Sequence, residues 1–289
     1  MSIEKAVIGY TLGEQAGIGP EVIEAALQRV SGQAQYKLIG KKIPCTPGQP
    51  TEATAHAALE HLEQAAAALK SGEIDAVVTA PICKEALHII GFNYPGQTEF
   101  FADRMGVKDY AMCLTGKHLT VVLCTTHKAI SEVPQLLQTE EIVRVGKLLA
   151  DFLRRTGVNA PKLALAGLNP HNGENGAFGD EEERIIQPAV EQLQQLIPWA
   201  RICGPCVPDC VYRDAADGFF DGVVAPYHDQ ALIPLKLLDF DNAVNATIGL
   251  PRLRVSPDHG TAFNIAGKGI ANPASTIRAF EVALHSVQG

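Results

Sequence analysis

Short runs of β-branched and other apolar residues alternate along this chain with longer segments in which apolar positions recur every three or four residues. The short runs predict strands and the longer segments predict amphipathic helices, and their alternation is typical of an α/β fold. The expected strands are Ala6–Thr11, Tyr36–Ile39, Ala76–Thr79, Lys162–Ala166 and Gly222–Ala225, with an antiparallel hairpin made of Ala111–Leu114 and Leu119–Thr125. The expected helices are Pro20–Val30, Thr51–Lys70, Thr139–Thr156, Glu181–Leu196 and Ser275–Val287.

One helix carries its own boundary signals. Thr139 is expected to cap its first turn, which is acidic, and Gly157 is expected to end it. Across the chain no low-complexity linker or internal repeat separates domains. The order of elements favours two interleaved lobes, approximately 1–100 with 245–289 in one and 101–244 in the other. The segment Lys41–Pro50, rich in proline, is expected to be a loop.

Composition narrows the class of protein. With 46% hydrophobic and 19% charged residues, the 289-residue chain is expected to be an ordinary globular protein. A net charge of −8 without a Lys/Arg run argues against nucleic acid as a partner. Apolar runs stay well below the roughly 20 residues that span a bilayer, and Met1 leads directly into a predicted strand, so neither membrane insertion nor a signal peptide is expected.

Seven scattered cysteines are typical of free thiols in a reducing cytoplasm, which is the expected location. Three of them, Cys203, Cys206 and Cys210, are close enough to suggest a zinc site or a redox pair. A structural zinc site needs a second ligand pair, and the sequence has no second C-x-x-C motif. We therefore expect buried or half-buried thiols around a strand end.

The segment Asp258–Pro273 is punctuated by Gly260, Gly267 and Gly269. Glycines allow backbone N–H groups to approach an anionic ligand closely, and Asn272, Pro273 and Ser275 can start a helix whose N-terminal end adds a positive field. An ordinary surface loop is the alternative. The segment is similar to the adenosine-binding loop of isocitrate and isopropylmalate dehydrogenases, and it lacks the G-x-G-x-x-G pattern of a Rossmann turn.

Three histidines, His127, His171 and His228, each follow the end of a predicted strand. Ligand-binding residues of α/β folds concentrate at such strand ends, and neutral imidazoles bind divalent metals while leaving positions open for substrate. Asp229 could orient one of these ligands. From the residues alone, a metal site and three structural histidines remain about equally favoured.

A second set of side chains is polar or cationic. Lys236, Asn245 and Arg254 would suit a phosphate or carboxylate if they met in one pocket, and solvated surface charge is the alternative.

Taken together, these motifs resemble the 4-hydroxythreonine-4-phosphate dehydrogenase family of the vitamin B6 pathway. The matching segments are Thr11–Glu21, Thr79–Pro81, Lys84, Gly96–Phe100, His127, Gly167–Glu174, Pro208–Asp209, Tyr227–Gln230 and Asn245–Pro273. The resemblance implies an isocitrate/isopropylmalate-dehydrogenase-like fold, with two lobes, a mixed β-sheet and three α/β/α layers. It also implies a homodimer whose active site is shared between subunits.

The resemblance further implies a role for each matching residue. The metal (Zn, Mg or Co) would be held by His127, His171 and His228, drawn from both subunits, and Asp209 and Asp229 would maintain the site. Substrate would contact Gln97, Thr98, Lys236, Asn245 and Arg254. The cofactor would contact His259, Gly260, Thr261, Ala262, Gly267 and Asn272. NAD is favoured over NADP, because the loop offers few cations for a 2′-phosphate beyond Lys268 and Arg278. Lys84 and a metal-bound water are both candidates for the general base.

Two features depart from the family pattern. Gln97 replaces the histidine of a Gly-His-Thr-Glu-Phe motif, and a glutamine can donate a hydrogen bond but never carry positive charge. The chain is also several tens of residues short between Pro20 and Thr79.

The expected reaction is metal-dependent, NAD-linked oxidation of 4-phosphohydroxy-L-threonine to 2-amino-3-oxo-4-phosphooxybutanoate, followed by decarboxylation. Related substrates remain open: threonate or erythronate 4-phosphate, or a carboxylated cis-dihydrodiol. A phosphate acyltransferase and a non-catalytic metabolite-binding relative are the alternatives of another class.

Overall fold

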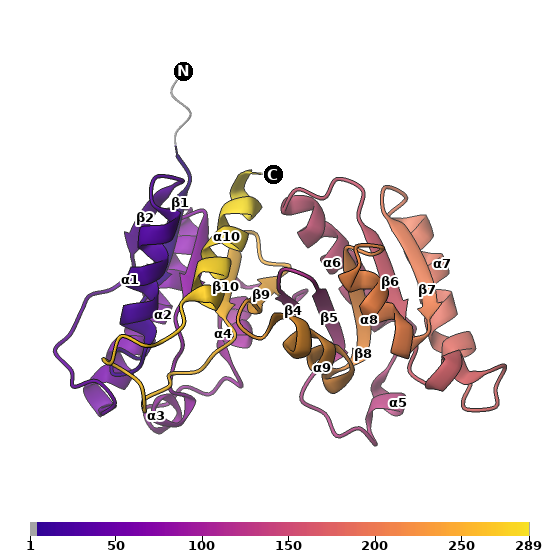
Figure 1. Ribbon diagram of the computed structural model, residues 1–289, viewed down its shortest axis with the longest axis horizontal. Helices are drawn as coiled ribbons and strands as arrows, with labels where there is room; N and C mark the ends of the chain where they lie inside the picture. The colour runs from indigo at the N-terminus through magenta and orange to yellow at the C-terminus, as the bar shows by residue number, and fades with distance from the viewer. Residues whose placement is uncertain (1–4, 289) are drawn as a thin grey trace. The chain divides into compact units, whose positions relative to one another are not determined.

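The computed structural model describes residues 5–288, which form two compact units. The first unit comprises the chain up to Lys108 together with Val244–Gln288, and the second is Asp109–Ala243. Each unit is a mixed β-sheet with helices packed on it (Figure 1). Within residues 5–288, no helix combines the length and the apolar character needed to cross a membrane.

The first unit has five strands in the order β2-β1-β3-β10-β9. The pairings β2–β1, β1–β3 and β3–β10 are parallel, and β9 is antiparallel to β10. The strands are β1 (Val7–Thr11), β2 (Gln35–Leu38), β3 (Ala76–Thr79), β9 (Val244–Ile248) and β10 (Leu253–Pro257). The helices are α1 (Gly19–Val30), α2 (Glu52–Ser71), α3 (Lys84–Ile89), α4 (Gln97–Met105) and α10 (Ala274–Gln288). Helix α10 packs on β10 and β3 and lies beside α1, whereas α2 packs on β1 and against α4 (Figure 1).

The second unit has the strand order β4-β5-β8-β6-β7. The β4–β5 hairpin is antiparallel as predicted, and the remaining pairings are parallel. The strands are β4 (Ala111–Thr115), β5 (Thr120–Thr125), β6 (Lys162–Ala166), β7 (Arg201–Cys206) and β8 (Gly222–Tyr227). The helices are α5 (Val133–Leu136), α6 (Thr139–Arg155), α7 (Gln187–Leu196), α8 (Pro208–Ala216) and α9 (His228–Asp239), with a 3-10 turn at Pro170–Gly173 and a π turn at Glu182–Ile186. Helices α8 and α9 share a buried apolar core with the strands.

The predicted strands and helices lie within two residues of the observed ones, and in α2 the boundary residues explain the agreement. Thr51 caps α2 with a reciprocal bond to Thr54, and Gly72 ends that helix in the left-handed conformation. The predicted helix Glu181–Leu196 is present as a π turn that continues into α7.

Two details of the sequence prediction are wrong. Gln138, not Thr139, holds the capping position of α6, and the Thr139 hydroxyl instead donates to the Ile185 carbonyl oxygen at 2.9 Å. All seven cysteines are free, and Cys203 and Cys206 are half-buried in β7, but Cys210 is exposed because it lies on the outer side of α8. Burial raises the pKa of Cys206 to about 11, so its thiol stays protonated.

A buried carboxylate fixes the hairpin of the second unit. Asp239, at the end of α9, is fully buried and accepts hydrogen bonds from the backbone N–H groups of His118 and Leu119 at 2.9 and 3.1 Å, and contacts the His118 ring nitrogen at 2.9 Å. Gly116 is required beside it, because a Cβ at that position would lie 2.3 Å from the carboxylate carbon. The hairpin turn is therefore held to α9 by one side chain.

We expect Asp239→Ala to lower the free energy of unfolding by about 2–3 kcal/mol, because two N–H groups would lose their buried acceptor. Urea denaturation followed by circular dichroism measures the change. Asp241→Ala removes an exposed carboxylate two residues away and is the matched control. Equal stability of the two variants would refute the anchoring role of Asp239.

Candidate functional site

The three predicted metal ligands all follow strands of the second unit. His127 comes two residues after β5, His171 five residues after β6, and His228 directly after β8 as the first residue of α9. Asp209 follows β7, in the first turn of α8. Since β5, β8, β6 and β7 run parallel, their carboxyl ends lie at one edge of the sheet. The prediction that each histidine lies just past a strand end is confirmed.

Two of these histidines are neighbours. The ring centroids of His127 and His228 are 5.7 Å apart with an interplanar angle of 44°. His228 Nδ1 lies 2.7 Å from Asp229 Oδ1, so a proton on Nδ1 leaves Nε2 with a lone pair for a metal. This contact is the one that the suggested orienting role of Asp229 would require.

His171 lies in a loop of unusual backbone conformation. Residues His171 to Gly176 all have positive φ, between 41° and 88°. Four of the six are not glycine, and left-handed conformations are unfavourable for such residues unless the surroundings enforce them. His171 itself is exposed, with its ring 6.5 Å from that of Phe178.

Glu182, which sequence reasoning missed, fixes the backbone that leads into this loop. Its buried carboxylate accepts from the backbone N–H groups of Leu168 and Asn169 at 2.7 Å each, and from Asn169 Nδ2 at 3.0 Å. Asn172 Nδ2 adds a bond to the Pro205 carbonyl oxygen at 2.8 Å. A signal was available, because Glu182 precedes the buried Ile185 and Ile186 by three and four residues and so lies on the buried face of its helix.

Gln230 links the strand ends to one another. Its Nε2 donates to the Gly167 carbonyl oxygen at 2.7 Å, and its Oε1 accepts from the Tyr212 hydroxyl at 3.3 Å. The first turn of α9, which carries His228, is thereby tied to the end of β6.

One chain does not assemble a complete three-ligand site. Among residues 5–288, His, Cys, Asp and Glu side chains form no group of three that could hold a metal ion. The structure therefore brings His127 and His228 together and leaves His171 outside such a group.

The predicted substrate residues divide between the units. Gln97, Thr98, Asn245 and Arg254 belong to the first unit, and Lys236 lies exposed on α9 of the second. Arg254 pairs with Thr247 across β10 and β9, and Asn245 pairs with Ser256, so all four side chains share one face of the sheet.

Arg254 is a buried cation whose partners are hydroxyl groups. It is 2% exposed, donates from Nε to Thr79 Oγ1 at 2.9 Å and from Nη1 to Thr247 Oγ1 at 3.5 Å, and lies over the Phe101 ring. Burial lowers the pKa of its guanidinium, and the nearby Glu99 partly opposes this shift. An anionic ligand would restore the stability of the charged form.

Helix α4 adds further polar groups to this face. The hydroxyls of Thr98 and Thr247 are 3.2 Å apart, and Gln97 Nε2 donates to the Ala80 carbonyl oxygen at 3.4 Å. Gln97 Oε1 and Asn245 Oδ1 are buried and have no hydrogen-bond partner within the protein. Buried acceptors of this kind are expected to bind a ligand or water.

The glycine-punctuated loop is also held by the first unit. Ile18 N–H donates to the Thr261 carbonyl oxygen at 2.9 Å, and Ala266 packs on Ile18 and Val22. Gly17 permits this approach, because a Cβ there would lie 2.6 Å from the same oxygen. His259 Nε2 contacts the Thr276 hydroxyl at 3.3 Å, and burial lowers the pKa of this imidazole.

One expectation about this loop needs correction. The Gly269 N–H donates to Glu21 Oε2 at 3.3 Å, so an internal carboxylate takes the group that was expected to face an anionic ligand. Asn272 Oδ1 accepts from the Ala274 N–H at 3.0 Å, and α10 begins there as predicted. Ala262 has a φ of 44°, in the left-handed region, whereas Gly260 is outside that region.

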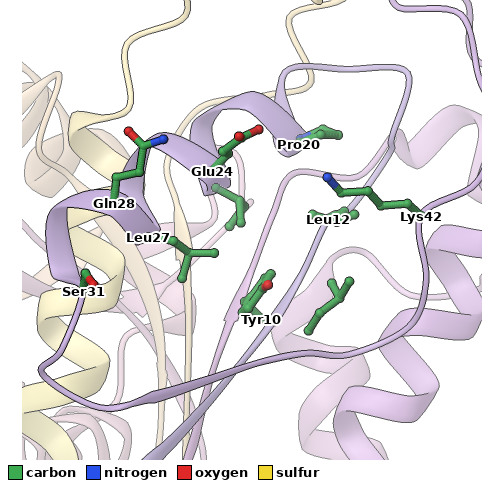
Figure 2. Close-up of a pocket in the computed structure, with 10 residues that line it drawn as sticks. Tyr10, Leu12, Pro20, Glu24, Leu27, Gln28, Ser31 and Lys42 are labelled. Atoms are coloured by element: carbon green, nitrogen blue, oxygen red, sulfur yellow. The ribbon is translucent and has the colours of Figure 1, made fainter.

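A separate cavity of about 640 Å³ lies elsewhere in the first unit, between α1, the ends of β1 and β2, and the chain around Lys42. Figure 2 shows Tyr10, Leu12 and Leu27 along its apolar side and Glu24, Gln28 and Lys42 around its edge. The predicted site residues do not line it.

Comparison with known proteins shows the family to which the chain belongs. The family model of the pyridoxal phosphate biosynthetic protein PdxA matches residues 11–283. A 4-hydroxythreonine-4-phosphate dehydrogenase from Desulfosudis oleivorans is 41% identical over 97% of this chain and 96% of its own. Its alignment extends over 324 positions, so it includes residues that this 289-residue chain lacks. A D-threonate 4-phosphate dehydrogenase from Pectobacterium atrosepticum is 37% identical over 96% of this chain and 98% of its own.

Solved structures give the same result. The 4-hydroxythreonine-4-phosphate dehydrogenase from Klebsiella pneumoniae superposes with a TM-score of 0.83 and 36% identity, covering 99% of this chain and all of its own. Isocitrate dehydrogenase from Methylococcus capsulatus superposes with a TM-score of 0.54 and 16% identity, covering 98% of this chain and 86% of its own. This likeness concerns the fold alone, and it confirms the predicted fold class. With its strand-end histidines, its buried Arg254 and relatives that match it over nearly its whole length, the chain belongs to the PdxA family of pyridoxal phosphate biosynthetic proteins.

Proposed function

We propose that this chain is an NAD-dependent dehydrogenase that oxidises the secondary alcohol of 4-phosphohydroxy-L-threonine. The observation that carries the proposal is the paired His127 and His228, with His228 oriented by Asp229 at the edge of a parallel sheet. The relatives named as dehydrogenases support it.

His127, His171 and His228 would hold a divalent metal (Zn, Mg or Co), which would act as a Lewis acid toward the substrate hydroxyl. In the proposed reaction the hydroxyl would lose a proton and the alcohol carbon a hydride, for which NAD would be the acceptor, and a ketone would result. Because that ketone is β to the carboxylate, CO₂ can then leave. Arg254, Thr98 and Asn245 would bind anionic and polar groups of the substrate, and the 258–273 loop would bind NAD.

Lys84 is our candidate for the proton acceptor. It begins α3, and its ammonium group lies 3.8 Å from the position of a Cβ built on Gly96, the residue before Gln97. Lys84 is therefore close to the polar face that carries Gln97 and Arg254, and a metal-bound water remains the alternative acceptor.

We also propose that the metal site is completed by a second copy of the chain. Helix α9, which begins at His228, exposes Ile233 (67%), Leu237 (83%) and the adjoining Phe240 (73%). Their spacing of four and three residues places them on one side, and a contiguous exposed apolar surface is typical of an interface. A homodimer would cover this surface and bring His171 of one subunit together with histidines of the other.

Mixtures of inactive variants test this arrangement. We expect His127→Ala, His171→Ala and His228→Ala each to abolish activity as purified homodimers. After mixing, unfolding and refolding two variants together, two of the three pairwise mixtures should regain about a quarter of wild-type activity, because half the dimers are mixed and each has one intact site.

The pair that stays inactive would identify the two histidines contributed by the same subunit. If every mixture stays inactive although size-exclusion chromatography shows mixed dimers, the shared site is refuted. Full metal content in any single variant, measured by atomic emission, would remove that histidine from the ligand set.

Glu182 should control metal affinity through the His171 loop. Glu182→Gln keeps an oxygen for the backbone N–H groups but loses the acceptor of Asn169 Nδ2, so the loop would be less well fixed. We expect metal binding, measured by titration calorimetry of apo protein, to weaken at least about tenfold. Glu183→Gln, an exposed neighbour, is the control, and equal affinities of the two variants would contradict the role of Glu182.

D-threonate 4-phosphate is a second candidate substrate. The buried, unpartnered Oε1 of Gln97 is an acceptor that would pair with a neutral hydroxyl of that substrate as well as with an ammonium group. The D-threonate 4-phosphate dehydrogenase among the relatives supports this choice.

A substrate panel separates the candidates. NADH formation at 340 nm should be seen with 4-phosphohydroxy-L-threonine, Zn²⁺ or Mg²⁺ and NAD, and EDTA should abolish it. Turnover of D-threonate or D-erythronate 4-phosphate alone, or of a carboxylated dihydrodiol, would shift the assignment to that substrate. Failure to bind NAD would refute the dehydrogenase, and acyl-CoA-dependent activity without metal would indicate an acyltransferase.

A further inference from the structure

The short loop Lys41–Pro50 is fixed by a side chain of the turn between β1 and α1. Gln15, which is 5% exposed, donates from Nε2 to the Lys41 carbonyl oxygen at 2.9 Å and accepts at Oε1 from the Ile43 N–H at 3.0 Å. The other end of the loop is attached as well, because the Gly48 N–H donates to the Ala16 carbonyl oxygen at 2.7 Å. An exposed segment is thereby held at three backbone positions.

This loop lies directly against the glycine-punctuated loop. A Cβ built on Gly48 would lie 3.0 Å from the Phe263 carbonyl oxygen, and one built on Gly267 would lie 2.7 Å from Pro47 Cβ. Both glycines are left-handed, with φ of 80° and 74°. The backbone of Gly48 therefore approaches that of Phe263, and the Pro47 ring approaches the backbone of Gly267, at positions where larger residues would force the two loops apart.

We propose that Lys41–Pro50 is a strut that holds the 258–273 loop in its NAD-binding conformation, with Gln15 as the positioning residue that anchors the strut. The proposal rests on the proposed function. The 258–273 loop is held on one side by α1, through Ile18 and Thr261, and on the other by Pro47 and Gly48. Support from both sides reduces the ordering that cofactor binding would otherwise require, so it should increase affinity for NAD without touching the reacting atoms.

The test is a comparison of NAD binding and turnover in Gln15→Ala. Loss of two hydrogen bonds should raise the Kd for NAD about tenfold, measured by titration calorimetry with NAD alone. The KM for NAD should rise in parallel, while kcat at saturating NAD, the KM for substrate and metal affinity stay unchanged. Gln28→Ala removes the same side chain from the exposed side of α1 and should bind NAD like the wild type.

A second pair of variants tests the loop contact itself. Gly267→Ala should weaken NAD binding, because its Cβ would meet the Pro47 ring at 2.7 to 2.8 Å. The double variant Gly267→Ala/Pro47→Gly lacks that ring and should bind NAD several-fold more tightly than Gly267→Ala alone. Its affinity should stay below that of the wild type, because the backbone strain at position 267 remains. Recovery would support the strut even if Gln15→Ala proved too unstable to purify.

The outcomes distinguish this inference from the proposed function. If Gln15→Ala binds NAD as tightly as the wild type, and adding Pro47→Gly to Gly267→Ala recovers no affinity, the proposed role of the Lys41–Pro50 loop is refuted. The proposed dehydrogenase activity would be unaffected by that result. Wild-type protein that does not bind NAD would overturn the dehydrogenase and the strut with it. A rise in substrate KM equal to that for NAD would show that Gln15 acts through general folding.

Discussion

The parallel pairing of β5, β8 and β6 is the constraint on which the candidate site depends. The register sets Thr125 opposite Tyr227, so the residues that follow these strands, His127 and His228, leave the sheet side by side. Strand β6 pairs on the other side of β8, which brings the His171 loop to the same edge. Apolar packing of α8 and α9 against these strands stabilises this register, since a slip by one residue would turn Val223 and Ala225 away from the apolar residues of these two helices.

Buried polar side chains then fix the parts of the backbone that strand pairing leaves free. Asp239 holds the β4–β5 turn, Glu182 holds the loop before His171, and Gln15 holds the loop after β2. In each case a buried side chain forms hydrogen bonds with backbone groups that no helix or strand pairs. The same bonds provide partners for the polar atoms of the buried side chain. Arg254 differs, because its partners are neutral hydroxyls, and that difference marks it as a group suited to a charged ligand.

The periodic elements could be predicted from the sequence because their signals are local. The capping of α2 by Thr51 and the alternation in β3 and β6 depend on neighbours in the chain. The sequence prediction omitted three strands, β7, β9 and β10, and five helices, α3, α4, α5, α8 and α9. Two of these omissions have a local reason, because Gly204-Pro205 interrupts the pattern of β7 and Pro234 that of α9. Contacts such as that of Thr98 with Thr247, 149 residues apart, depend on how elements pack and leave no local pattern. The hydrogen bond from the Gly269 N–H to Glu21, 248 residues away in the chain, leaves no local pattern either.

The two departures from the family pattern both lie in the first unit, and the backbone connects them. Gln97 donates to the Ala80 carbonyl oxygen, and the Pro81 carbonyl oxygen accepts from the Glu14 N–H at 2.8 Å, next to Gln15. Gly13 has a φ of 62° and approaches Pro81 so closely that a Cβ would lie 2.1 Å from its oxygen. A shift of Thr79–Pro81 would therefore move Gln97, a proposed substrate contact, and Gln15, which anchors the Lys41–Pro50 loop, together. The histidines belong to the other unit, so substrate preference and cofactor affinity can change together while the proposed metal ligands stay the same.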